Sequence, residues 1–250
     1  MRKPTSIIIL FFLISLFIFC NQKEPPLQPA DYKYEYFPLK IGAWAVYDVT
    51  KRVLDTKAGM DSLEKYQIKE VVESTFTDAE GKASYRIEKY RRNDTSITWD
   101  NATVDNVFFS TLTSTTAERI EDNLRFVKLV FPALEKRKWN GNGYIISQDS
   151  SLFFYKNWSY EYTKIDEMQQ VGTFVFDSTM TVNQINDTTD NLVEARFGLE
   201  KYVKHVGLVY KKLWHLEYRT QIIIPPIPPW EERATNGFTL EIMLNSYGEN

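Results

Sequence analysis

The chain has 250 residues, a formal net charge of −3, an aromatic content of 15% and one cysteine. This charge provides no basic field for a phosphate backbone, which argues against a nucleic-acid-binding protein. A single cysteine excludes an intramolecular disulfide, and with it a small disulfide-stapled fold. The aromatic content favours β-sheet, because aromatic side chains are enriched in strands.

The N-terminal stretch is typical of a signal peptide. Arg2 and Lys3 precede an apolar run, Ile7–Phe19, whose length matches the apolar region of such peptides. As a helix the run would span only about 20 Å, whereas the hydrocarbon core of a bilayer is about 30 Å thick. The sequence therefore favours a cleaved leader over a permanent membrane span.

Cys20 follows the apolar run directly and is the only cysteine in the chain. The bulky residues at 17–19 suit ordinary signal peptidase poorly, because that enzyme requires small side chains. The stretch resembles a bacterial lipoprotein signal, although Phe19 stands where a small residue is usual. The resemblance implies that Cys20 is acylated and anchors the chain in the cell envelope, on the periplasmic face of the outer membrane or at the cell surface. An incidental cysteine in the leader is the alternative.

Three segments are expected: a leader over residues 1–19, a lipidated N-terminus and linker over 20–34, and a single β-rich domain over 35–250. The linker contains Glu24–Ala30 (EPPLQPA), whose prolines favour an extended, fairly stiff chain. After the leader, 28 basic residues stand against 33 acidic ones, so the charge becomes −5. A domain of this size can bury enough surface to fold on its core alone.

The first third of the domain alternates between apolar and polar residues with a period of two. Ala43–Leu54 is predicted as the first strand. Tyr66–Phe76 and Ala83–Arg91 flank a turn in which Asp78 comes early and Gly81 late, so they predict a hairpin.

Two longer strands are predicted in the middle of the chain, Ser96–Leu112 and Thr115–Phe131. The second is apolar on both faces toward its end, which is typical of a central strand. Pro132 then ends it, because proline cannot donate to the ladder.

The last third continues the β pattern. Leu192–Leu199 is the one stretch where a short helix competes, and Pro225–Pro229 cannot lie in a central sheet. The remaining predicted strands are Leu152–Ile165, Val171–Phe176, Thr179–Ile185, Tyr202–Val206, Leu208–Thr220 and Phe238–Asn245. The expected fold class is mostly β: a single large antiparallel sheet curved into a barrel or half-barrel. A two-sheet β-sandwich is the alternative, and we expect at most one short helix besides the signal peptide.

Catalytic signatures are missing from the sequence. His205 and His215 lie ten residues apart, with no cysteine or acid at ligand spacing, so each is predicted to be a sheet-surface or core residue. There is no nucleophile elbow and no phosphate-binding glycine loop. We therefore expect no enzymatic activity, no catalytic or cofactor-binding residue, no cofactor and no metal site.

Three stretches resemble a family of uncharacterised lipoproteins from Gram-negative bacteria. They are Tyr36–Val49 (YFPLKIGAWAVYDV), Val72–Arg92 and Tyr202–Tyr210 (YVKHVGLVY). The first is similar to the FPLxxGxWxY motif of that family, except that Val46 takes the last position and Tyr47 follows it, and the third contains the VGLVY motif. The likeness extends over most of the chain after the leader. It implies one β-rich lipoprotein domain of unknown function and supplies no catalytic residue. His205 departs from the pattern, because a small residue is more usual there.

Together these features favour a lipid-anchored, non-catalytic binding or envelope-assembly module. Its expected partners are the membrane, through lipidated Cys20, and an envelope protein, glycan or lipid ligand. Two alternatives remain at this point. One is a carrier that shelters an apolar ligand or lipid in an open half-barrel, and the other is a surface polysaccharide hydrolase that uses two carboxylates from distant strands.

Overall fold

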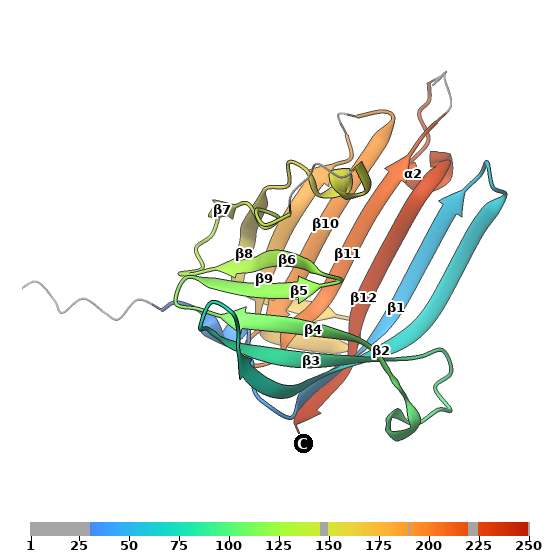
Figure 1. The fold of residues 1–250 in the computed structure, drawn as a ribbon. Coiled ribbons are helices and arrows are strands. Elements are labelled where there is room, and N and C mark those ends of the chain that lie inside the picture. The colour runs from blue at the N-terminus through green and yellow to red at the C-terminus, as the bar shows by residue number, and fades with distance from the viewer. Residues whose placement is uncertain (1–30, 146–149, 190, 220–224, 250) are drawn as a thin grey trace, which may run out of the picture. The chain divides into compact units, whose positions relative to one another are not determined.

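The computed structural model describes residues 31–145, 150–189, 191–219 and 225–249. The leader, Cys20 and most of the linker lie outside these residues. Residues 32–250 form one compact unit (Figure 1).

One antiparallel sheet of twelve strands makes up this unit. The strands are β1 (Ala43–Asp55), β2 (Met60–Thr77), β3 (Ala83–Arg92), β4 (Val104–Leu112), β5 (Thr116–Glu121), β6 (Leu124–Val130), β7 (Lys138–Trp139), β8 (Tyr160–Val171), β9 (Phe174–Asp187), β10 (Glu194–Val203), β11 (Gly207–Glu217) and β12 (Asn236–Glu249). The short helical elements are η1 (Tyr34–Tyr36), η2 (Trp99–Asn101), η3 (Ser150–Tyr155) and α2 (Trp230–Arg233).

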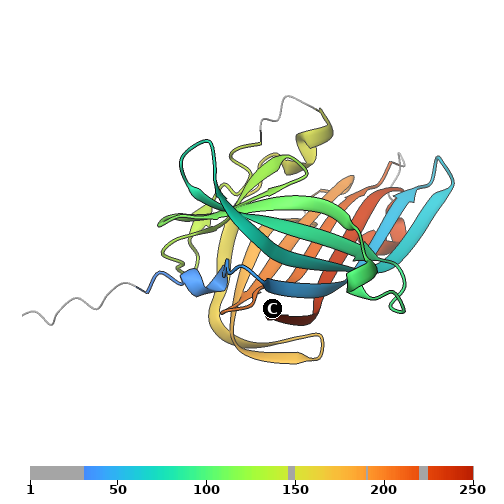
Figure 2. The same cartoon turned by 60° about the horizontal axis from the view of Figure 1, so that its bottom comes forward.

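The strand order makes the first and last strands neighbours. It runs from β6 back to β1, then from β12 back to β7, so the two halves of the chain are meanders joined by the β1–β12 pair. The two edges of the sheet, β6 and β7, therefore come from the middle of the chain. Figures 1 and 2 show that β3–β6 curl over the concave face of β9–β11, so the sheet is nearly closed into a barrel.

Side chains complete the closure where no strand ladder does. The Val130 amide donates to Tyr162 Oη at 2.8 Å, and Tyr162 Oη donates to the Val130 carbonyl at 2.9 Å. Trp139 Nε1 donates to the Val127 carbonyl at 2.8 Å. These bonds satisfy backbone groups of edge strand β6 that would otherwise be unpaired.

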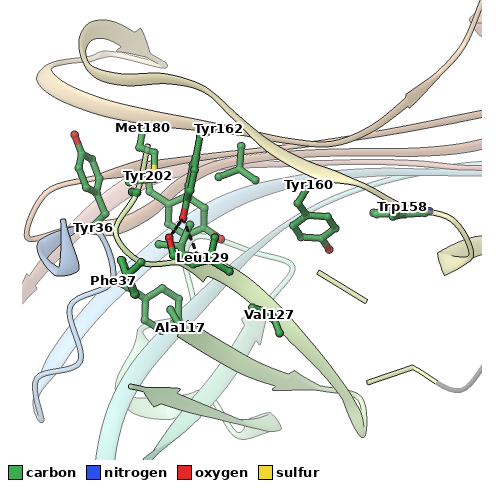
Figure 3. Close-up of a cluster of buried hydrophobic side chains, with 14 of the residues drawn as sticks. Tyr36, Phe37, Ala117, Val127, Leu129, Trp158, Tyr160, Tyr162, Met180 and Tyr202 are labelled. Carbon is green, nitrogen blue, oxygen red and sulfur yellow. Dashed lines mark hydrogen bonds between the residues drawn. The ribbon is translucent and has the colours of Figure 1, made fainter. Parts of the chain in front are cut away.

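The curled sheet has two limbs, strands β1–β6 and strands β7–β12. The largest core cluster lies between them. Figure 3 shows aromatic side chains of β8 and β10 against residues of β5 and β6. Tyr160, Tyr162, Met180 and Leu129 are each at most 1% exposed. Such burial of aromatic surface is the main term that stabilises the curled form over an open sheet.

The N-terminal segment around Lys33, Glu35 and Tyr36, hereafter the N-terminal strap, is bound to one end of the barrel. Lys33 and Lys204 each approach the Asp166 carboxylate to 2.6 Å, and Tyr36 Oη donates to it at 2.8 Å. The His205 amide donates to the Glu35 carbonyl at 2.8 Å. The strap directs the residues after η1 across the barrel end that Figure 2 turns forward.

The single curved sheet confirms the barrel-like class predicted from sequence, and the two-sheet sandwich is not formed. β1, the β2–β3 hairpin and β12 confirm the predicted strands in those regions. Within the described part of the chain α2 is the one α-helix, and Leu192–Leu199 contributes to strand β10 instead.

Several predictions in the middle of the chain were wrong. Ser96–Leu112 is a strand only from Val104 onward, and the first part of Leu152–Ile165 belongs to the helical element η3 instead. Thr115–Phe131 is not one strand but the β5–β6 hairpin, whose turn residues Asp122 and Asn123 have φ of 50° and 65°. Asp and Asn tolerate this left-handed conformation and are favoured in two-residue hairpin turns. Strand β6 is also an edge strand rather than a central one, because the opposite limb, not a ladder, buries its second face.

Candidate binding site

A cavity of about 480 Å³ lies inside the barrel at the end crossed by the N-terminal strap. Its volume is within the range of small-molecule sites in proteins, about 300–1,000 Å³. Strands from both limbs line it, together with the segment after η1 and the last residues of β12. The apolar lining residues include Phe37, Leu39, Trp44, Val72, Ile87, Val206 and Leu208.

The two sequence motifs converge on this cavity. Phe37-Pro38-Leu39 and Trp44 line one side, and Val206-Gly207-Leu208 from the β10–β11 turn line another. Gly207 has φ of 87°, a conformation that favours glycine, and it lies against Pro38. Tyr47 Oη donates to the Leu208 carbonyl at 3.0 Å, which ties the turn to β1. The fold therefore brings these two segments of the sequence together at one cavity.

Charged side chains line the deep part of the cavity, hereafter the charged floor. It consists of Glu70, Arg119, Glu121, Lys128 and Glu200, with Lys211 adjoining. These residues come from β2, β5, β6, β10 and β11, so only the curled sheet brings them together. All six side chains are at most 20% exposed.

Ion pairs connect the members of the charged floor. Lys128 Nζ lies 3.0 Å from Glu200 Oε1 and 3.6 Å from Glu121 Oε1. Arg119 Nη2 donates to Glu70 Oε1 at 2.6 Å, and Arg119 Nε lies 2.9 Å from Glu121 Oε1. Each buried charge thus has a partner of opposite sign, as burial requires.

The pairing holds two carboxylates in the charged form. Burial would raise the pKa of Glu121 and Glu200, but Lys128 and Lys211 outweigh it and lower the pKa of both. Tyr202 Oη, which donates to Glu200 Oε2 at 2.6 Å, lowers the pKa of Glu200 further. Conversely, burial would lower the pKa of Lys211, but Glu121 and Glu200 raise it above its usual range.

A hydroxyl group beside the charged floor lacks a hydrogen-bond partner among the described residues. Ser110, on β4, lines the cavity and is 1% exposed. Its Oγ makes no hydrogen bond with any described residue. A buried hydroxyl without a partner is costly, by about 1–3 kcal/mol, so its presence at a cavity wall needs a physical reason.

The two histidines lie apart in the structure. His205, in the β10–β11 turn, lines the cavity. His215, on β11, instead lines a second, wider hollow of about 760 Å³, where it stacks on Phe154 and lies 3.2 Å from Glu194 Oε1. In the described ranges no group of three or more His, Cys, Asp or Glu residues is arranged to hold a metal ion. Cys20, the predicted lipidation site, is outside those ranges.

Sequence reasoning missed the charged floor. Its members are far apart in the chain, and nothing in their spacing predicts that they meet. One signal was present: Lys128 interrupts an apolar run, Phe126–Phe131, that is buried on both faces. A lysine in such a position is expected to pair with a buried acid.

Comparison with known proteins assigns no family. No protein-family model and no curated protein matches the chain. A crystal structure of a candidate lipoprotein from Parabacteroides distasonis is similar at 12% identity and a TM-score of 0.32, covering 88% of this chain and 100% of the other. At that distance it assigns neither a family nor a function. None of the helices in the described residues is long and apolar enough to cross a bilayer.

Proposed function

We propose that this chain is a lipid-anchored, non-catalytic binding protein of the cell envelope, which holds an amphiphilic small molecule inside its barrel. The observation that carries the proposal is the cavity, which combines an apolar wall with a charged floor. The leader and Cys20 support the envelope location and the lipid anchor, on the periplasmic or the outer face of the outer membrane.

The wall and the floor suit different parts of one ligand. Burial of an apolar chain against Phe37, Leu39, Val72 and Ile87 would contribute about 25 cal/mol for each Å² removed from water. The charged floor is shielded and already paired, so it offers fixed dipoles that orient a polar group. Sites with mainly apolar walls and a few placed polar groups are typical of small-molecule binding.

A hydrolase with two carboxylates is the second candidate, because Glu121 and Glu200 reach the cavity from different strands. Such an enzyme needs one carboxyl group that stays protonated near neutral pH as general acid. The lysines beside Glu121 and Glu200 lower the pKa of both groups instead. This electrostatic arrangement favours binding over hydrolysis.

Native mass spectrometry of the full chain purified from cells tests the proposal. We expect a small molecule to accompany the wild type and to be absent from Ala45→Trp, because Ala45 lines the cavity and a tryptophan would fill it. Ala83→Trp, at an exposed position at the start of β3, is the matched control and should retain the molecule. Val72→Phe is a milder filling variant if Ala45→Trp does not fold.

Two results would contradict the proposal. One is the same set of bound masses, or none, in the wild type and in the filled variants. The other is turnover of the bound molecule by the wild-type chain, which would support the second candidate function, a hydrolase.

A further inference from the structure

The charged floor is balanced in sign. Three cations, Arg119, Lys128 and Lys211, stand among three carboxylates, Glu70, Glu121 and Glu200. The pair at the mouth, Lys40 and Glu249, is balanced as well. The charged floor therefore has no excess charge of either sign that a charged ligand group could neutralise.

A charged ligand group would therefore disturb the floor. An added carboxylate or phosphate would give a net negative cluster in a buried site, and an added ammonium would give a net positive one. Burying a charge without a partner is strongly unfavourable, since desolvation exceeds what already-paired neighbours return.

A neutral polar group would instead satisfy the floor. Ser110 Oγ has one donor and two acceptor sites and no described partner. A ligand hydroxyl or ester carbonyl next to it would complete its hydrogen bonding without changing the charge balance. The apolar side chains of Val72 and Ile87 line the same cavity and can take a hydrocarbon chain.

From these observations we infer that the ligand is an amphiphile with an uncharged, hydroxyl- or ester-bearing head and one hydrocarbon chain, of the monoacylglycerol class. Its head hydrogen-bonds to Ser110 beside the charged floor, and its chain lies along the apolar wall. The inference rests on the proposed function, because it names the class of molecule that the same cavity takes.

The test compares two brominated probes that share one acyl chain and differ in the head, which is an uncharged glycerol ester in one and a carboxylate in the other. The full chain, extracted from membranes and exchanged into amphipol, is titrated with 1-(9,10-dibromostearoyl)glycerol and with 9,10-dibromostearate while tryptophan fluorescence is recorded. Trp44 lines the cavity, so a brominated chain in the cavity should quench it. Trp44→Phe should remove most of that quenching, which locates the probe.

We expect the glycerol ester to bind at least tenfold more tightly than the anionic probe, which is a difference of about 1.4 kcal/mol. Equal or tighter binding of 9,10-dibromostearate would overturn the inference and leave the proposed function in place. Binding of neither probe, together with no co-purified molecule, would overturn both. Quenching that persists unchanged in Trp44→Phe would place the probe outside the cavity and overturn the inference.

Ser110→Ala tests the position of the head. We expect affinity for the glycerol ester to fall about fivefold, because one neutral hydrogen bond is lost, while affinity for the anionic probe stays the same. The ligand-free chain should be no less stable, since the substitution removes an unsatisfied hydroxyl. Thr179→Val is the matched control: Thr179 Oγ1 is also buried without a described partner, but Thr179 does not line the cavity. Unchanged ester affinity in Ser110→Ala would contradict the placement of the head.

Discussion

Lys128 and Glu200, 72 residues apart in the chain, form a buried ion pair with 3.0 Å between Nζ and Oε1. Lys128 belongs to edge strand β6 and Glu200 to β10, so the pair links the two limbs of the curled sheet. Both side chains are at most 5% exposed. The pair therefore couples closure of the barrel to the charge balance of the floor.

Removing one partner should destabilise the protein more than removing both. We expect Lys128→Met to lower the free energy of unfolding by about 3 kcal/mol, because it leaves a carboxylate in excess in a buried site. Adding Glu200→Gln restores the balance and should recover part of that loss. Urea unfolding of the two single variants and the double variant measures the coupling.

The exposed pair Lys138–Glu161, at 3.4 Å, provides the control. Lys138→Met should cost less than about 1 kcal/mol, as surface pairs do. Additive effects in the Lys128 and Glu200 cycle would show that the pair does not couple the two limbs.

Tyr162→Phe should loosen the closure of the barrel. The hydroxyl of Tyr162 both accepts from the Val130 amide and donates to the Val130 carbonyl. Its loss leaves two buried backbone groups unsatisfied, so we expect a loss of about 2 kcal/mol in stability. Hydrogen exchange at the Val130 amide should accelerate more than exchange in β1. Tyr144→Phe, at a 52% exposed tyrosine, should leave both measurements unchanged; an equal effect there would argue against a closing role for Tyr162.

Strand β12 was predictable from sequence, whereas strand β6, which is buried on both faces, was misread. In β12, alternation from Phe238 to Leu244 marks a face, and that strand lies centrally beside β1. In β6 the same logic failed, because side chains of the opposite limb bury Val127 and Leu129 as a neighbouring strand would. The hydrophobic pattern of a strand indicates which of its faces are buried. It does not indicate which element of the fold buries them.

The binding site was predictable only in its outline. The segments around Phe37 and Val206 were singled out from the sequence, and both line the cavity. The charged floor depends on strand order and on the curl of the sheet, which place Glu70 next to Arg119 and Lys128 next to Glu200. Neither relationship has a local sequence signature.

Cys20→Ala tests the lipid anchor. We expect the protein to move from the membrane fraction to the soluble fraction, because acyl chains on Cys20 would be the anchor. Ser15→Ala, within the same leader, is the control and should remain in the membrane. Retention of Cys20→Ala in membranes would rule out lipidation at Cys20 as the anchor.

Two glycines with positive φ should respond differently to alanine. At Gly207, with φ of 87°, an added Cβ would lie 3.5 Å from Pro38 Cδ, an ordinary contact. Gly207→Ala should therefore cost only the conformational strain, about 1–2 kcal/mol. At Gly237, with φ of 121°, the Cβ would lie 1.9 Å from the His215 carbonyl oxygen. We expect Gly237→Ala to be far more damaging, and thermal unfolding of both variants checks the order; a reversed order would contradict the packing of β12 on β11.

The contacts between the N-terminal strap and Asp166 predict a dependence of stability on pH. Burial would raise the pKa of Asp166, but Lys204, Lys33 and Tyr36 outweigh it and lower the pKa to about 2. An unfolded chain binds the proton near pH 3.9. The strap therefore contributes stability above that pH and loses it as the pH falls toward 2.

Asp166→Asn isolates this contribution. The variant should have a lower free energy of unfolding than the wild type from about pH 5 to about pH 7. This difference in free energy should disappear as the pH approaches about 2. The effect should be modest, because the carboxylate is 35% exposed and solvent screens it. Asp177→Asn, at an exposed position on β9, is the control and should show no such convergence. A stability difference that stays constant from pH 7 to pH 2 would show that Asp166 acts through packing, and not through its charge.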